Sequence, residues 1–87
     1  MFDVKLKRKL TKKDYESLKW MSLYACGERY YDENKILRVA EIIQQSVEDE
    51  AEASEYSKWI VNAATGKEFS WHRLQSFCIE LMETYKQ

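Results

Sequence analysis

Signals that begin and end helices recur along this 87-residue chain, and they constrain its fold more than any other feature. Thr11 is followed three residues later by Asp14, as in a capping box, and Gly27 suits a left-handed cap at the end of the same helix. Asp32 and Ser70 are candidate N-caps of a second and a third helix. The chain contains no proline. Together these signals predict a mainly α-helical protein.

Apolar residues recur at helical spacing between these signals, which predicts a buried stripe on each helix. The first helix contributes Leu18, Met21 and Ala25, beside Trp20 and Tyr24; the second Ile36, Val39, Ala40, Ile43 and Val47; the last Trp71, Leu74, Phe77, Cys78, Leu81, Met82 and Tyr85. A chain of this length fits one domain. We therefore expect a single domain over residues 1–87, with a small bundle of three to four helices over residues 11–87.

Residues 2–7, FDVKLK, alternate apolar and charged side chains, which is the two-residue period of a strand. No other segment is an evident partner strand. We therefore expect residues 1–10 to form a basic extended arm or a short β-strand. Such a segment stays mobile, covers a helix or pairs with a second molecule, and the last option would produce a homodimer.

The acidic run EDEAEASE, residues 48–55, is predicted to be the solvent-facing side of an amphipathic helix, which requires no function. Three of its carboxylates, Glu48, Glu52 and Glu55, fall on one side. A later apolar stripe, which includes Trp59, is out of phase with the stripe before the run. Either the helix breaks between residues 49 and 54, or Trp59 stands beside the carboxylates on a partner-binding surface. We expect the break, because one helix of some thirty residues is long for this domain.

Charge is unevenly divided along the chain: residues 1–29 carry eight Lys/Arg against four Asp/Glu, and residues 30–57 carry two against eight. This asymmetry favours an electrostatic partner, or it solvates two surfaces. The two cysteines are too few for a disulfide framework, and no apolar signal segment follows Met1. We therefore expect a cytoplasmic protein. No run approaches the roughly 18 apolar residues of a membrane span, so we expect no membrane contact.

Catalytic residue patterns are sparse. His72 is the only histidine, and Cys26 is expected at a helix C-terminus, where the helix dipole opposes thiolate formation. Cys78 falls on an apolar stripe. Two cysteines and one histidine do not make a known zinc spacing, and two glycines cannot form a phosphate-binding loop. We expect no enzymatic activity, no cofactor and no metal.

Two binding functions are consistent with these patterns. In the first, a small interaction protein binds and inhibits or regulates a protein or a protein–nucleic acid complex. The segment GERYYDEN, residues 27–34, sets Arg29, Tyr30 and Tyr31 side by side, and Arg and Tyr are common at binding hot spots. Glu48, Glu52, Glu55 and Trp59 are the second candidate contact set. By analogy, short helical phage and mobile-element proteins of the anti-CRISPR and anti-defence type act in this way.

In the second, the protein binds DNA. The segment FDVKLK, then Leu18 and Gly27, then ILRVA at residues 36–40, resembles the ribbon-helix-helix repressors over about half the chain. The resemblance implies a dimer whose paired N-terminal strands lie in the DNA major groove, with Lys5 and Lys7 facing the bases. The acidic Asp3 would also face the bases, where it is unfavourable, and residues 50–87 have no counterpart in the minimal fold of that family. A basic cluster suited to phosphate contacts, or to solvation alone, comprises Lys5, Lys7, Arg8, Lys9, Lys12 and Lys13.

Overall fold

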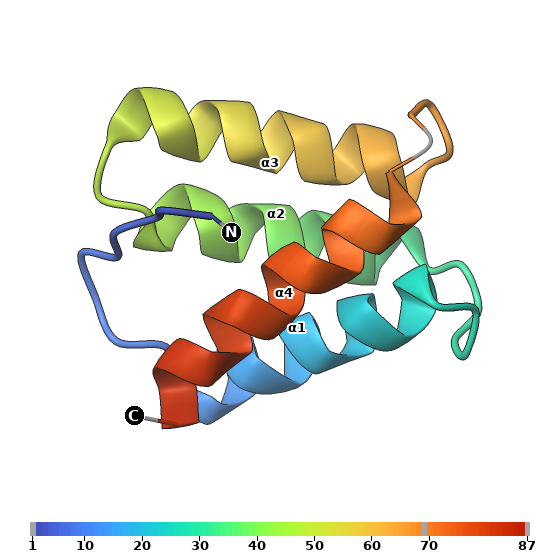
Figure 1. Ribbon diagram of the computed structural model, residues 1–87, viewed down its shortest axis with the longest axis horizontal. Helices are drawn as coiled ribbons and strands as arrows, with labels where there is room; N and C mark the ends of the chain where they lie inside the picture. Colours follow the sequence, from blue (N-terminus) through green and yellow to red (C-terminus); the bar gives the residue numbers. More distant parts are fainter. Residues whose placement is uncertain (1, 69, 87) are drawn as a thin grey trace.

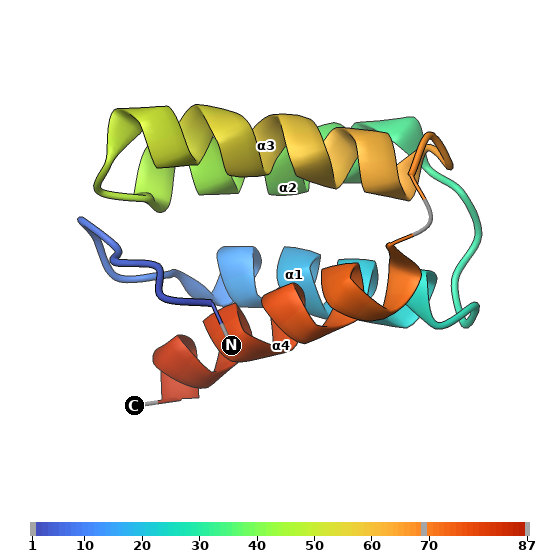
Figure 2. The ribbon, with the colours of Figure 1, turned by 45° about the horizontal axis from the view of Figure 1, so that its top comes forward.

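The described residues, 2–68 and 70–86, of the computed structural model form an extended N-terminal segment followed by four helices joined by short loops. They are α1 (Lys12–Ala25), α2 (Glu33–Ser46), α3 (Glu50–Ala64) and α4 (Trp71–Lys86). α2 packs beside α3, and α1 beside α4, so that two layers of two helices face each other (Figures 1 and 2). The prediction of a mainly helical bundle is confirmed.

The helices begin and end where the local signals predict. Thr11 and Asp14 form a full capping box: the Asp14 N–H donates to Thr11 Oγ1 at 3.2 Å, and the Thr11 N–H donates to Asp14 Oδ2 at 3.0 Å. The Asp32 carboxylate accepts from the Lys35 N–H at 3.2 Å. Gly27 has a φ of +87°, which a residue with a Cβ adopts only under strain.

The acidic run contains the expected helix break. α2 ends at Ser46, and Asp49 caps α3 by accepting a hydrogen bond from the Glu52 N–H at 3.0 Å. Residues 47–49 form the turn between the two helices. The second apolar stripe is therefore out of phase because it belongs to a separate helix.

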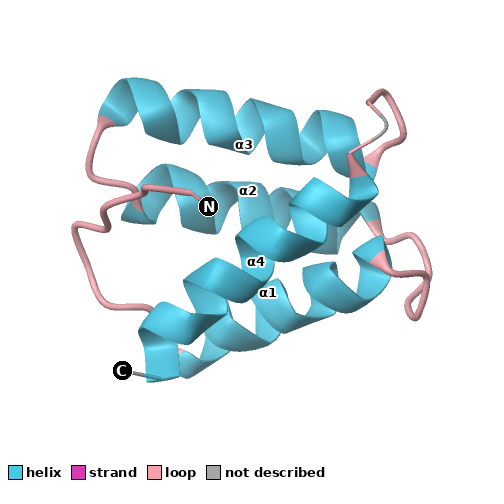
Figure 3. Cartoon of the chain, in the orientation of Figure 1, coloured by secondary structure: helices cyan, strands magenta, loops and turns pink. Residues whose placement is uncertain are grey.

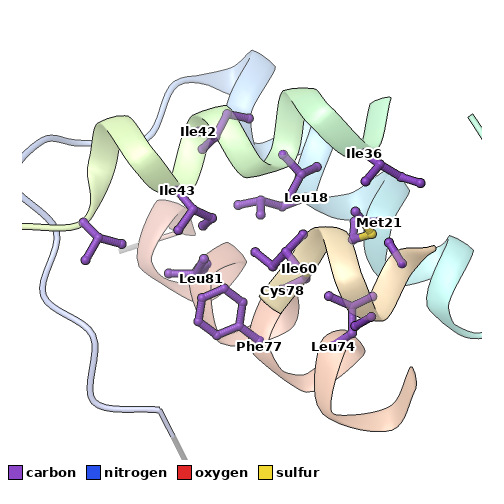
Figure 4. Close-up of a cluster of buried hydrophobic side chains, with 14 of the residues drawn as sticks. Leu18, Met21, Ile36, Ile42, Ile43, Ile60, Leu74, Phe77, Cys78 and Leu81 are labelled. Atoms are coloured by element: carbon purple, nitrogen blue, oxygen red, sulfur yellow. The ribbon is translucent and has the colours of Figure 1, made fainter. Parts of the chain in front are cut away.

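The core lies between the two layers and takes side chains from all four helices (Figure 4). Leu18, Ile42, Ile60 and Phe77 have no exposed surface. The predicted stripes supply most of this core. Their outer members depart from the prediction: Ala25, Ala40, Trp71 and Met82 are only partly buried, and Tyr85 is 39% exposed.

The N-terminal segment is extended, but the prediction of a β-strand is wrong for the described residues, since none is found in 2–68 or 70–86 (Figure 3). Leu6 makes one isolated antiparallel bridge to Val47. The Lys7 N–H donates to the Ser46 carbonyl at 2.8 Å, and the Glu48 N–H donates to the Lys5 carbonyl at 2.9 Å. The α2–α3 turn, residues 47–49, is too short to extend this pairing into a β-ladder. The segment instead covers the helices of its own chain.

Phe2 fixes the N-terminal end of this segment through contacts with α4. Its ring packs edge-on against Phe77, with the ring centres 4.9 Å apart, and its N–H lies 3.2 Å from Glu80 Oε2. Val4 and Leu6 also pack against the core. The alternation of apolar and charged residues thus marks a half-buried extended chain, with one face on the helices and one in water.

Candidate functional site

The loop between α1 and α2 presents the predicted contact residues Arg29, Tyr30 and Tyr31 at one end of the bundle (Figure 1). The Tyr30 side chain is 95% exposed and Tyr31 is 57% exposed. The Tyr31 ring approaches that of Tyr24 edge-on, with 6.4 Å between centres. Tyr30 therefore contributes little to the fold and is available to a partner.

An open groove of about 500 Å³ runs along the outer side of α1 and reaches this loop. Tyr15 and Tyr85, which line this groove, stack with their ring centres 4.9 Å apart, and the Lys86 ammonium lies 6.0 Å from the Tyr15 ring centre. The lining residues are Lys12, Tyr15, Glu16, Lys19, Trp20, Leu23, Arg29 and Tyr85. The groove thus combines aromatic surface with three cations.

A second groove, of about 350 Å³, lies on the other side of Glu16 and Trp20, between α1 and α2. The Lys35 ammonium lies 5.6 Å from the centre of the Trp20 ring. Its lining residues are Lys13, Glu16, Ser17, Trp20, Lys35 and Arg38. We call the six cations of the two grooves the cationic face: Lys12, Lys13, Lys19, Arg29, Lys35 and Arg38.

The cationic face is largely free of neutralising carboxylates. All six of its side chains are exposed, and Glu16 is the one acidic residue that lines the grooves. Within the described part of the chain, the ion pairs are Arg8–Asp14, Arg38–Asp14 and Arg38–Glu41. Five of the six cations therefore lack an acidic partner within 4.0 Å, and the face carries an excess of positive charge.

The structure places the members of the predicted basic cluster in different surroundings. Arg8 donates to the buried Asp14 carboxylate at 2.7 Å, so its charge is neutralised within the fold. Lys5 lines a hollow beside Glu48 and Glu52. Lys7 and Lys9 are exposed on the extended segment. Only the remaining two members, Lys12 and Lys13, join the cationic face.

The predicted acidic contact residues lie at the other end of α2 from the α1–α2 loop (Figure 1). Glu48 and Glu52 line a hollow of about 480 Å³ together with Asp3, Lys5 and Asp49. Glu55 is exposed on α3. Glu48 is thus separated from the α1–α2 loop, with its Arg29 and Tyr30, by the length of α2, about 20 Å.

Trp59 packs into the bundle instead of forming an acidic and aromatic surface. Its ring lies edge-to-face with Phe77, with ring centres 5.6 Å apart, and contacts Phe2 and Tyr56. The Arg73 guanidinium lies 4.9 Å from the Trp59 ring centre. Because these contacts occupy a half-buried side chain, Trp59 belongs to the core that supports the extended segment.

The thiols and the histidine lie apart from the grooves. A hydrogen bond from the Cys26 thiol to the Glu28 carboxylate, at 3.2 Å, raises the pKa of Cys26. Burial raises the pKa of Cys78 to about 12. His72 is exposed on α4. Both thiols are therefore weaker nucleophiles than an ordinary cysteine at neutral pH.

Comparison with protein-family models, curated proteins and solved structures finds no match to this chain. The functional assignment accordingly depends on the geometry of its own residues. No helix of the described residues has the length and apolar character needed to cross a membrane.

Sequence reasoning missed Lys19, Trp20, Lys35 and Arg38 as members of one surface. Lys12 and Lys19 are seven residues apart, or two helical turns, so their shared side of α1 could have been found from the spacing. Lys35 and Arg38 come from α2, and only the packing of α2 against α1 places them beside Trp20.

Proposed function

We propose that this protein is non-enzymatic and binds a macromolecular partner through the α1–α2 loop, thereby inhibiting or regulating that partner. The observation that carries the proposal is the 95% exposure of Tyr30 next to Arg29, which itself lines the larger groove. An aromatic ring kept in water by a loop gains free energy when a partner buries it, and Tyr and Arg are enriched at binding hot spots.

The scaffold supports this role. The loop is anchored on both sides, by the positive φ of Gly27 and by the Asp32 cap of α2, so that little ordering is needed on binding. A rigid surface of this kind is enough to cover part of a partner and so block that partner's own contacts. We propose the anti-CRISPR or anti-defence class of phage and mobile-element inhibitors, acting in the cytoplasm.

Partner capture tests the proposal. The immobilised protein is exposed to a nuclease-treated lysate of the cells in which it is made, and the bound proteins are compared with those held by Arg29→Ala/Tyr30→Ala. We expect at least a tenfold loss of capture, corresponding to about 1.4 kcal/mol or more. The melting temperature should not change, because the Tyr30 side chain is almost fully exposed.

A matched control removes one exposed cation and one exposed apolar side chain elsewhere: Lys58→Ala/Ile79→Ala, on α3 and α4. This variant should capture the partner as the unmodified protein does. Equal capture by the Arg29→Ala/Tyr30→Ala variant would remove the loop from the contact surface.

A further inference from the structure

The cations of the cationic face are arranged in two rows on either side of one ridge. Glu16 and Trp20 are one helical turn apart on α1 and line both grooves. Lys12, Lys19 and Arg29 line the groove on one side, and Lys13, Lys35 and Arg38 line the groove on the other. Lys12 and Lys19 are separated by about 10 Å along the helix axis. Such a row suits an extended chain that carries a negative charge on each repeating unit.

Aromatic rings lie among these cations. Trp20 and the Tyr15–Tyr85 pair line the larger groove, with one face of Trp20 stacked on Tyr24 and one face of Tyr15 on Tyr85. The exposed Tyr30 neighbours Arg29 at the end of this groove. The Lys35 ammonium near Trp20 and the Lys86 ammonium near Tyr15 are held by flexible side chains, which can leave the rings for a phosphate group. Cations that follow a backbone, combined with rings on which bases stack, are the features that bind single-stranded nucleic acid.

We propose that the cationic face binds single-stranded nucleic acid. The proposal rests on the proposed function, since it assigns the chemistry of part of the macromolecular partner: a protein–nucleic acid complex with an exposed single strand. An acidic peptide would form ion pairs with the lysines, but its carboxylate side chains would not stack on the aromatic rings. A duplex fits the surface less well, because the ridge that would enter a DNA groove carries the Glu16 carboxylate between the two rows of cations.

Fluorescence anisotropy of the full chain tests this inference. The probes are a labelled oligothymidylate of about 20 nucleotides, which is long enough for a typical single-strand site, a duplex of equal length, and poly-glutamate. The oligothymidylate should bind more tightly than the duplex or poly-glutamate. Its affinity should fall steeply as the salt concentration rises from about 50 to about 200 mM. Tighter binding of the duplex or of poly-glutamate, or no binding of oligothymidylate at low salt, would overturn the assignment.

Substitutions locate the site. Lys12→Ala/Lys19→Ala should lower the salt dependence, the slope of log K against log salt, by about 1.4, because each phosphate contact on a single strand contributes about 0.7. Lys12→Arg/Lys19→Arg should retain binding. Lys58→Ala/Lys67→Ala makes the same change in net charge at exposed positions outside both grooves and should leave the slope unchanged. An equal loss in this control would show that net charge, and not the cationic face, determines binding.

The two tests separate the two proposals because no substitution is used in both: the capture test replaces Arg29 and Tyr30, and the anisotropy test replaces Lys12 and Lys19. Capture that depends on Arg29 and Tyr30, together with no oligothymidylate binding, would leave the interaction function standing and refute only the nucleic-acid inference. Oligothymidylate binding that depends on Lys12 and Lys19, with capture unaffected by the loop variant, would instead move the contact surface from the loop to the grooves.

Discussion

At the scale of single residues, Asp14 connects three parts of the chain. Its carboxylate caps α1 at the Thr11 N–H, pairs with Arg8 of the extended segment at 2.7 Å and lies 3.7 Å from Arg38 of α2. Burial raises the pKa of this group. The hydrogen bonds from Arg8 and Thr11 and the Arg8 charge outweigh that effect, so the pKa of Asp14 lies below its ordinary value.

Replacing this carboxylate by an amide should therefore destabilise the protein. We expect Asp14→Asn to lower the free energy of unfolding by about 2 kcal/mol at neutral pH, because it removes the partner of a partly buried cation. A lowered folded-state pKa adds stability above the unfolded pKa of about 3.9, and this stability is lost as pH falls through the folded value. Urea unfolding should show the two proteins converging in that acidic range. A difference that persists at the lowest pH would mean that packing, not charge, explains it.

At the scale of elements, the Asp49 cap at the start of α3 sets where the chain turns within the acidic run. Asp49 accepts from the Glu52 N–H, and Glu50 and Glu52 place further negative charge in the first turn, where the helix dipole favours it. The five carboxylates of residues 48–55 thus include a cap and its neighbours. Part of this run therefore has a structural explanation.

Replacing Asp49 should lower the free energy of unfolding through the loss of the α3 cap. Asp49→Ala is expected to cost about 1 kcal/mol, while Asp49→Ser retains an acceptor oxygen and should cost less. Chemical denaturation measures both values. A stronger helical signal in circular dichroism, without loss of stability, would indicate that α2 and α3 join into one helix when Asp49 is absent.

The sequence predicts those elements whose causes are local. The Thr11 and Asp32 caps act within three residues of themselves, so these two helix starts follow from the residues, whereas the sequence placed the start at Asp49 only within residues 49–54. The place of Leu6 depends on Val47, forty-one residues away, and no local pattern contains that contact. The cationic face is also non-local, because α1 and α2 must pack before Lys35 approaches Trp20. The exposure of Tyr30 has a local cause, because the segment GERYYDEN, residues 27–34, connects two predicted helices.

At the scale of the whole molecule, the extended segment satisfies its apolar side chains within one chain. Phe2, Val4 and Leu6 pack against the core, and the backbones of Lys5 and Lys7 bond to the α2–α3 turn. A ribbon shared by two chains would have to replace these contacts.

We therefore expect the intact protein to be a monomer by light scattering after gel filtration. A variant that lacks residues 2–7 should also be monomeric and less stable by about 3 kcal/mol, since three partly buried apolar side chains are lost. It keeps Arg8, and hence the ion pair to Asp14. A dimer that dissociates on this deletion would show that the segment pairs between chains, and it would favour the ribbon-helix-helix arrangement.

The pairing of α1 with α4 also has a consequence during synthesis. α2 and α3 are neighbours in sequence and can pair as soon as both have left the ribosome, whereas α1 waits for a partner that begins at Trp71. At roughly 5 to 20 residues per second, the first residue of α4 is made some 2 to 9 s after the last residue of α1. Until α4 has been made, Leu18 and Met21 lack the neighbours that this helix provides, and Phe2 lacks Phe77. The nascent chain is therefore most open to chaperones and proteases until the last helix emerges.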